Sequence, residues 1–223
     1  MKGVYEMYSY PFYNAASKSP STIEVLGEGA VTATPDRAIV VLGAITEGNT
    51  LQLVQAENAK IVTNIIQSMQ KIGIPLEKIQ TNDFRIDTQY DYVDGKQIFR
   101  GYRVTDLLQI TTDRLDQSGL IVDTAVAQGA NSVSSIRFTL AQPEVYANHA
   151  LSLAIRNARQ KAVTIAQTLG VNIAAVPFRI QELSRSNEPM PFKATFHAES
   201  TGTPVQPGEL MVNASVRAWY CII

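Results

Sequence analysis

The stretch from residue 23 to 47 constrains the fold more than any other part of the chain. It reads IEVLGEGAVTATPDRAIVVLGAITE, two strand-like runs separated by Pro35 and Asp36. These two residues favour a turn, because proline presets φ and an aspartate side chain can bond backbone amides. Gly27 and Gly29 lie on the apolar face of the first run and predict a bulge or the close approach of another backbone. A second strand rather than a helix follows them, so they are a weak signal for a phosphate loop.

Composition limits the classes of protein that the chain can belong to. It has 223 residues, of which 45% are hydrophobic, and its 19 basic and 20 acidic residues give a net charge of -1. That length suits one large domain or two small ones with a self-supporting core. The balanced charge gives no general attraction to nucleic acid or anionic lipid, and the scattered basic residues do not form a basic face. We therefore expect no nucleic-acid partner, and no integral membrane segment because no apolar run is long enough.

Apolar periodicity predicts three helices, at residues 50–72, 114–128 and 143–169. Each is followed by a glycine, and the third begins at Pro143, as is typical of helix ends. The third helix carries an alanine at every fourth position, which predicts that a sheet or another helix packs closely on that stripe; the alanines are Ala150, Ala154, Ala158, Ala162 and Ala166.

Alternating polar and apolar residues predict strands between these helices. Asp94 and Gly95 are the strongest short hairpin signal and separate strands at about 79–93 and 97–112. Aromatic residues surround this hairpin: Tyr90, Tyr92, Phe99 and Tyr102. Asp83, Asp87 and Asp91 share the opposite strand face, which we interpret as a solvated face, with a loose divalent-ion site as the alternative.

Further strands are predicted at 131–140, at 176–183 and from residue 210 to the C-terminus, the last of them edge-like. The order is roughly ββα-ββα-βα-ββ, with helices following strand hairpins. This order favours an α+β fold with antiparallel β-sheets packed against helices and disfavours a doubly wound nucleotide fold. We expect residues 1–20 to form a Tyr-rich leader or arm, and residues 21–223 to form one α+β domain or two sub-domains.

The first twenty residues also bear on the cellular compartment of the protein. A lysine is present, but Glu6 interrupts the apolar stretch that a secretory signal would need. As written, the chain is expected to be cytoplasmic; if an export signal was removed, it is expected to be periplasmic or envelope-associated. The tyrosines of this segment either pack locally on their own domain or dock on a neighbouring subunit.

Several segments resemble the SIMPL-domain family, which includes YggE-like bacterial proteins and periplasmic immunogenic proteins. They are IEVLGEGAVTATPDRAIVVLGA, GIPLEKIQTNDFRI, GYRVTDLLQITTDRLDQSGLIVDTAVAQGANSVSSIRFTL, AIRNARQKAVTIAQTLGV and PGELMVNASVRAWY. Together they cover nearly everything from Ile23 to Tyr220. The sequence departs from the family at Asn157, where aspartate is common, and in its Tyr-rich leader. The resemblance implies stress-linked roles, envelope association in some members and self-assembly in some, with no defined biochemical activity.

The residues offer little for catalysis. A nucleophile would be Cys221 or a serine, and the histidines that could assist it are His149 and His197, far apart in sequence. There is no Gly-x-Ser-x-Gly elbow, and two histidines with one cysteine make a zinc site improbable. We expect no enzyme activity, no catalytic residues, and no metal or other cofactor.

The sequence is best interpreted as a non-enzymatic, self-assembling protein. The alternative is a small-molecule or peptide-binding module, and an enzyme of unknown reaction is less favoured. If the aromatic hairpin and residues 184–206 bury each other between subunits, assembly is favoured; if they line a pocket, ligand binding is favoured. A homo-oligomer would use exposed strand edges and aromatic side chains, and the expected contacts are Tyr8, Tyr10, Phe12, Tyr13, Phe192, Phe196 and Trp219.

Overall fold

The computed structural model describes residues 21–185, 190–192, 205 and 207–223. The helices are α1 (Leu51–Lys71), α2 (Ser118–Ala127) and α3 (Pro143–Leu169), with short 3-10 turns at Leu76–Lys78 and Leu115–Gln117. The strands are β1 (Thr22–Ala33), β2 (Arg37–Gly48), β3 (Ile79–Val93), β4 (Lys96–Thr112), β5 (Ser132–Thr139), β6 (Arg179–Arg185), β7 (Met190–Phe192) and β8 (Glu209–Cys221).

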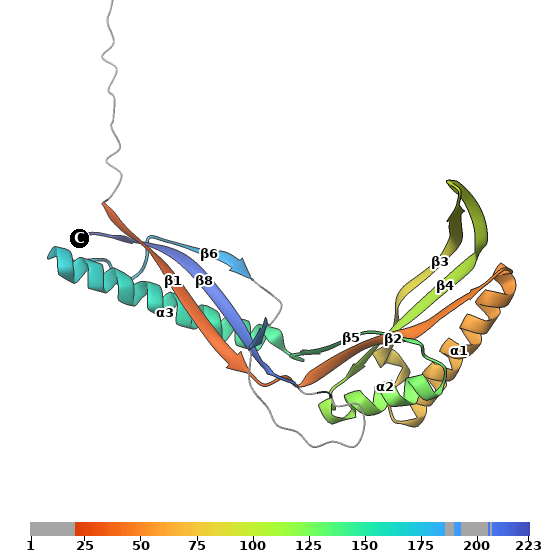
Figure 1. Cartoon of the computed structure of the whole chain (residues 1–223). Coiled ribbons are helices and arrows are strands. Elements are labelled where there is room, and N and C mark those ends of the chain that lie inside the picture. The colour runs from red at the N-terminus through yellow and green to blue at the C-terminus, as the bar shows by residue number, and fades with distance from the viewer. Residues whose placement is uncertain (1–20, 186–189, 193–204, 206) are drawn as a thin grey trace, which may run out of the picture.

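Two antiparallel sheets lie at opposite ends of an elongated molecule (Figure 1). The first has the order β1-β8-β6, with β7 also paired to β8, and α3 packs on β1 and β8. The second has the order β3-β4-β2-β5, with α1 and α2 packed on it. Its chain order β2-α1-β3-β4-α2-β5 is the split βαβ arrangement of ferredoxin-like domains. The expected α+β class with antiparallel sheets against helices is confirmed.

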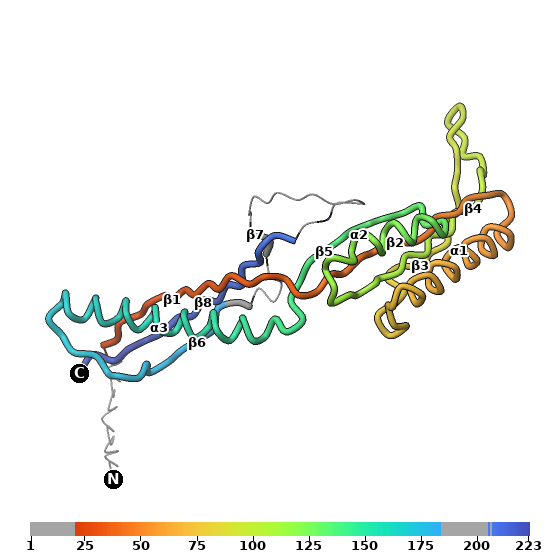
Figure 2. The backbone as a smooth tube through the Cα atoms, turned by 90° about the horizontal axis from the view of Figure 1, so that it is seen from below, coloured from red at the N-terminus to blue at the C-terminus, as the bar shows by residue number. Residues whose placement is uncertain are grey.

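The link between β1 and β2 differs from the expected hairpin. The two strands pair in different sheets and follow one another along the long axis of the molecule (Figure 2). Asp36 ties this link to the segment that joins β5 to α3: its Oδ1 accepts the Ala141 N–H (2.6 Å), and its own N–H donates to the Thr139 carbonyl (3.2 Å). The turn residues therefore mark a passage between sheets rather than a reversal of the chain.

The C-terminal strand also differs from the prediction. β8 was expected to be edge-like, but it lies between β1 and β6: it pairs with β1 over residues 210–221 and with β6 over residues 214–219. The last group of strands also contains the short additional strand β7, so the order is ββα-ββα-βα-βββ. β8 is central because the N-terminal strand β1 pairs with one of its edges and β6 pairs with the other.

Small residues allow α3 to lie unusually close to β1. All five alanines of the predicted stripe are buried on the sheet, which confirms the close packing expected of them. Gly27 and Gly29 are the matching small residues on β1, since a Cβ atom on either would lie 2.1 Å from a carbonyl oxygen of α3. The prediction of a close backbone approach at these glycines is confirmed.

Enlarging the alanine stripe should therefore destabilise the first sheet. Ala158 is fully buried, and a Cβ at Gly27 would lie only 2.7 Å from its side chain. We expect Ala158→Leu to lower the free energy of unfolding by roughly 1–3 kcal/mol, because the added carbons have no space to fill. Thermal melting measured by circular dichroism checks this, with Arg159→Leu on the exposed side of the helix as control. A variant at residue 158 that melts like the parent would show that the helix can move away from β1.

Two other local predictions, for the ends of α3 and for the β3–β4 turn, are also met. α3 begins at Pro143 and ends at Gly170, which has the left-handed conformation (φ 67°). Asp94 and Gly95 both have positive φ, as the tight mirror-image turn between β3 and β4 requires. The second helix is shorter than expected, because its first turn is the 3-10 segment Leu115–Gln117.

Candidate functional site

The β3–β4 hairpin extends beyond the rest of the second sheet. β2 ends at Gly48, which pairs with Tyr102, so no described strand lies beside the part of the hairpin between Thr88 and Tyr102. α1 packs on β2 and β4, and its first turns lie next to the end of β2. The outer part of the hairpin consequently projects from the molecule, as Figure 1 shows.

Apolar side chains gather on one face of this projection. The pairing of β3 with β4 places them on the same face of the sheet as Val104, Leu108 and Ile110. Leu108 and Ile110 belong to the core cluster that includes residues of α1, so this is the face that carries the helices. Tyr92 is 74% exposed, and Phe84, Ile86, Tyr90 and Phe99 are also exposed. We call the following set the hairpin face: Phe84, Ile86, Tyr90, Tyr92, Phe99 and Tyr102. Exposed apolar clusters are common where proteins bind one another.

Aromatic contacts hold part of the hairpin face in a fixed arrangement. The rings of Tyr90 and Phe99 meet edge to face with centroids 6.1 Å apart, and the rings of Phe99 and Tyr102 do the same at 5.2 Å. A one-residue bulge at Arg100 allows Phe99 and Tyr102 to lie on the same face although they are three residues apart. The cluster is therefore organised before any partner binds.

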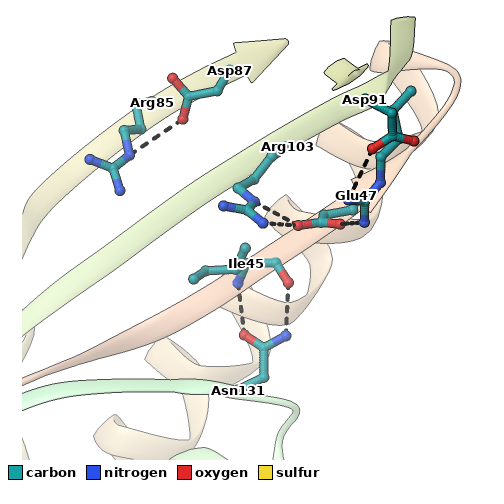
Figure 3. A network of polar contacts seen from close by, with 8 residues as sticks. Ile45, Glu47, Arg85, Asp87, Asp91, Arg103 and Asn131 are labelled. Atoms are coloured by element: carbon teal, nitrogen blue, oxygen red, sulfur yellow. Dashed lines mark hydrogen bonds and ion pairs between the residues drawn. The ribbon is translucent and has the colours of Figure 1, made fainter. Parts of the chain in front are cut away.

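Charged residues hold the base of the hairpin on its other face (Figure 3). Arg103 Nε donates to Glu47 Oε1 at 2.6 Å, and Arg100 Nη2 donates to Glu47 Oε2 at 3.4 Å. Arg100 also lies 3.9 Å from the Asp91 carboxylate. The hairpin is thus connected to the end of β2 by side chains as well as by the strand ladder.

The predicted acidic face lies at the surface, with Asp83 and Asp87 partly buried and Asp91 exposed. Arg85 lies between two of its members and contacts Asp83 at 3.7 Å and Asp87 at 3.5 Å. Asp91 contacts Arg100 instead. Each of the three carboxylates therefore has an arginine partner, which fits the solvated-face interpretation better than the divalent-ion alternative.

A buried polar cluster lies where α1 crosses β2 and β4. Asn58 is 1% exposed, and its Nδ2 lies 3.1 Å from the Ala44 carbonyl and 3.2 Å from the Val104 carbonyl. On the next part of β4, Asp106 Oδ1 is buried and has no hydrogen-bond partner among the described residues. Desolvation by burial raises the pKa of Asp106 above its ordinary value. No sequence pattern singled out either residue, since both interactions depend on the fold.

The raised pKa makes stability depend on pH in a definite direction. Below the ordinary pKa the Asp106 carboxyl is protonated in both states and carries no penalty. The pKa of Asp106 is higher in the folded state than in the unfolded state. Between these two pKa values the folded state holds more protons than the unfolded state, so the free energy of unfolding falls as pH rises. We expect Asp106→Asn to remove this loss and to be more stable than the parent at neutral pH. Urea unfolding between about pH 4 and 8 checks this, by comparing how the free energy of unfolding changes with pH in Asp106→Asn and in the parent. If the free energy of unfolding depended on pH in the same way in Asp106→Asn and in the parent, this prediction would be wrong.

Asn131 has a structural role that sequence reasoning missed. Its Oδ1 accepts the Ile45 N–H at 2.8 Å, and its Nδ2 donates to the Ile45 carbonyl at 2.7 Å (Figure 3). The side chain therefore continues the pairing of β5 with β2 past the start of β5, next to the charged base of the hairpin. A long-range contact of this kind leaves no local sequence signal.

Comparison with known proteins identifies the family. The family model SIMPL, described as a protein of unknown function (DUF541), matches residues 23–220. The chain belongs to the SIMPL family. The 26 kDa periplasmic immunogenic protein of Brucella melitensis is 31% identical over 96% of this chain and 90% of its own length. The uncharacterized protein YggE of Escherichia coli strain K12 is 25% identical over 86% of this chain and 76% of its own length.

These relatives bear on location. The expectation of a cytoplasmic protein finds no support in them, because the Brucella relatives are named periplasmic. Among the helices that the structure describes, none is both long and apolar enough to cross a membrane.

The structure places the candidate catalytic residues of this SIMPL protein far apart. Cys221 pairs with Thr22 at one end of β1, whereas His149 is next to Ala150, whose carbonyl lies against Gly29. Seven residues of extended strand separate Thr22 from Gly29, about 23 Å. His197 lies outside the described residues. The described part of the chain holds no group of three or more His, Cys, Asp or Glu side chains that could bind a metal.

Most of the predicted assembly contacts lie outside the part of the chain with described side chains. Phe192 belongs to β7 by its backbone, and the side chains of Tyr8, Tyr10, Phe12, Tyr13, Phe192 and Phe196 are not described. Trp219 is partly buried: its Nε1 donates to Glu24 Oε2 at 3.2 Å, and the Arg179 guanidinium lies over its ring at 4.9 Å. A role for these seven residues in assembly stays a prediction.

Proposed function

We propose that this SIMPL protein is a non-enzymatic, self-assembling protein of the bacterial periplasm, whose subunits associate through the hairpin face. The observation that carries the proposal is the projecting hairpin with its pre-arranged exposed aromatic cluster. Burying this exposed apolar cluster against a second surface would be favourable, by about 25 cal/mol for each Å² of apolar surface removed from water.

A second copy of the chain fits this surface on two grounds. β3 is the outer strand of its sheet, so its free edge is available to the same edge of another subunit around a two-fold axis. The net charge of -1 offers little repulsion between copies. The tyrosines and phenylalanines of residues 8–13, with Phe192, Phe196 and Trp219, are proposed as additional contacts.

The remaining parts of the proposal rest on separate observations. The separation of His149 from Cys221 argues against these two residues acting as a base and a nucleophile. The printed name of the Brucella relatives supports the periplasm as the location.

A mass measurement on matched variants tests the role of the hairpin face. We expect the double variant Tyr92→Ser/Phe99→Ser to shift the assembly toward the monomer, with an association at least about tenfold weaker, or about 1.4 kcal/mol. The control Leu120→Ser/Val126→Ser changes two similarly exposed apolar residues of α2 and should keep the parent mass. Light scattering during gel filtration reports the masses. An unchanged mass for the hairpin variant would show that assembly does not use this surface.

A further inference from the structure

A groove runs between the free edge of β1 and α3 in the first sheet. It has a volume of about 600 Å³ and is lined by Glu24, Val25 and Leu26 from β1 and by five side chains of α3: Asn157, Gln160, Lys161, Thr164 and Ile165. It lies on the other sheet from the hairpin face (Figure 2), so it is a separate surface from the one proposed for assembly.

The backbone of β1 offers hydrogen-bonding groups to this groove. Among the described residues β1 pairs with β8 alone, and in an antiparallel pair alternate residues direct both backbone groups away from the partner. Two contacts identify the outward set: the Glu28 N–H donates to Asn157 Oδ1 at 3.1 Å, and Lys161 Nζ donates to the Leu26 carbonyl at 2.8 Å. The N–H and C=O of Glu24 and the N–H of Leu26 therefore point into the groove, and no described residue forms a hydrogen bond with them.

The spacing of these groups selects the kind of ligand. They repeat every second residue along an extended strand, and another extended peptide backbone presents matching donors and acceptors at that repeat. Asn157 and Lys161 occupy the edge farther along β1, so they limit the length of strand that can be added.

The side chains beside the edge define the composition of the peptide. Ile165 on α3 is 38% exposed and Leu26 on β1 is also exposed, so apolar side chains can pack on either side of the added strand. Lys161 has three N–H donors, and its bond to the Leu26 carbonyl uses one of them. No carboxylate of the described residues pairs with Lys161, so an acidic group on the peptide would be complementary to it.

We propose that this groove binds an extended peptide, which adds as a strand to the free edge of β1 and places a carboxylate next to Lys161. A second copy of β1 fits less well, because it would bring another Lys161 with the same charge and the same two side chains already bonded to its edge. The proposal adds a ligand-binding role that does not depend on assembly through the hairpin face.

Selection of short random peptides displayed on phage, with the full chain as bait, tests this proposal. We expect enriched peptides that combine alternating apolar residues with an acidic residue. Measured by fluorescence polarisation, a synthetic enriched peptide should bind Ile165→Glu at least about tenfold more weakly than the parent. Ile155→Glu changes an isoleucine of the same helix with the same 38% exposure outside the groove, and it should bind like the parent. No enrichment, or equal binding to both variants, would overturn the proposal.

N-methylation of the peptide tests strand addition without altering the protein. Methyl groups on the amides that face β1 should abolish binding, whereas methyl groups on the alternate amides should have little effect, giving a two-residue periodicity. The same loss at every position, or at none, would contradict strand addition. If Ile165→Glu instead lowers the mass of the protein in sedimentation, the groove is an interface between copies and the peptide proposal is wrong.

Discussion

Gly27→Val is expected to lower the free energy of unfolding by about 3 kcal/mol or more, at the upper end of the usual cost of overpacking. A Cβ at residue 27 would lie 2.1 Å from the Ala154 carbonyl oxygen and 2.7 Å from the Ala158 side chain. Because the nearest atom is helix backbone, no change of a side-chain rotamer can relieve the contact. The helix must instead move away from β1, which exposes the alanine stripe.

Urea unfolding followed by circular dichroism measures this change. Ala30→Val is the matched control, because residue 30 is exposed on the other face of the same strand and valine is favoured in strands. Its stability should stay within about 0.5 kcal/mol of the parent. A Gly27→Val protein as stable as this control would show that α3 does not pack on β1 as closely as described.

Asn58→Asp is expected to cost about 3 kcal/mol or more at neutral pH, as removal of a compensating partner from a buried polar group does. The Asn58 Nδ2 is surrounded by three oxygen atoms: the Ala44 and Val104 carbonyls and the Thr46 hydroxyl, which itself donates to the Val54 carbonyl. A carboxylate at this position would have no donor among them. It would therefore carry a desolvated charge facing three acceptors.

Gln55→Glu is the control for this prediction. It makes the same change from amide to carboxylate on the same helix, but residue 55 is exposed. Urea unfolding at neutral pH should show a large loss for Asn58→Asp and a small one for Gln55→Glu. Equal losses in the two variants would mean that residue 58 has access to water.

Features encoded locally could be predicted from the sequence. The four-residue repeat of alanines and the two glycines of β1 indicated close packing before their partners were known, because only small residues allow backbones to approach. The Asp94-Gly95 pair indicated the position of the hairpin turn. Strands that meet at this turn bring Tyr90 next to Phe99.

Features that depend on distant parts of the chain could not be predicted. Pro35 and Asp36 signal a turn, but they do not say whether the strand that follows returns to the same sheet. That depends on β8 and β4, which pair with β1 and β2 from far along the sequence. The bonds made by Asn58 and Asn131 likewise join residues that are 46 and 86 positions from their partners.

Sedimentation velocity of the purified parent protein at micromolar concentration tests whether the chain assembles. We expect a species heavier than one chain, whose proportion rises as the protein is concentrated. A single species with the mass of one chain, unchanged on concentrating, would contradict it and would make ligand binding the better account of this protein.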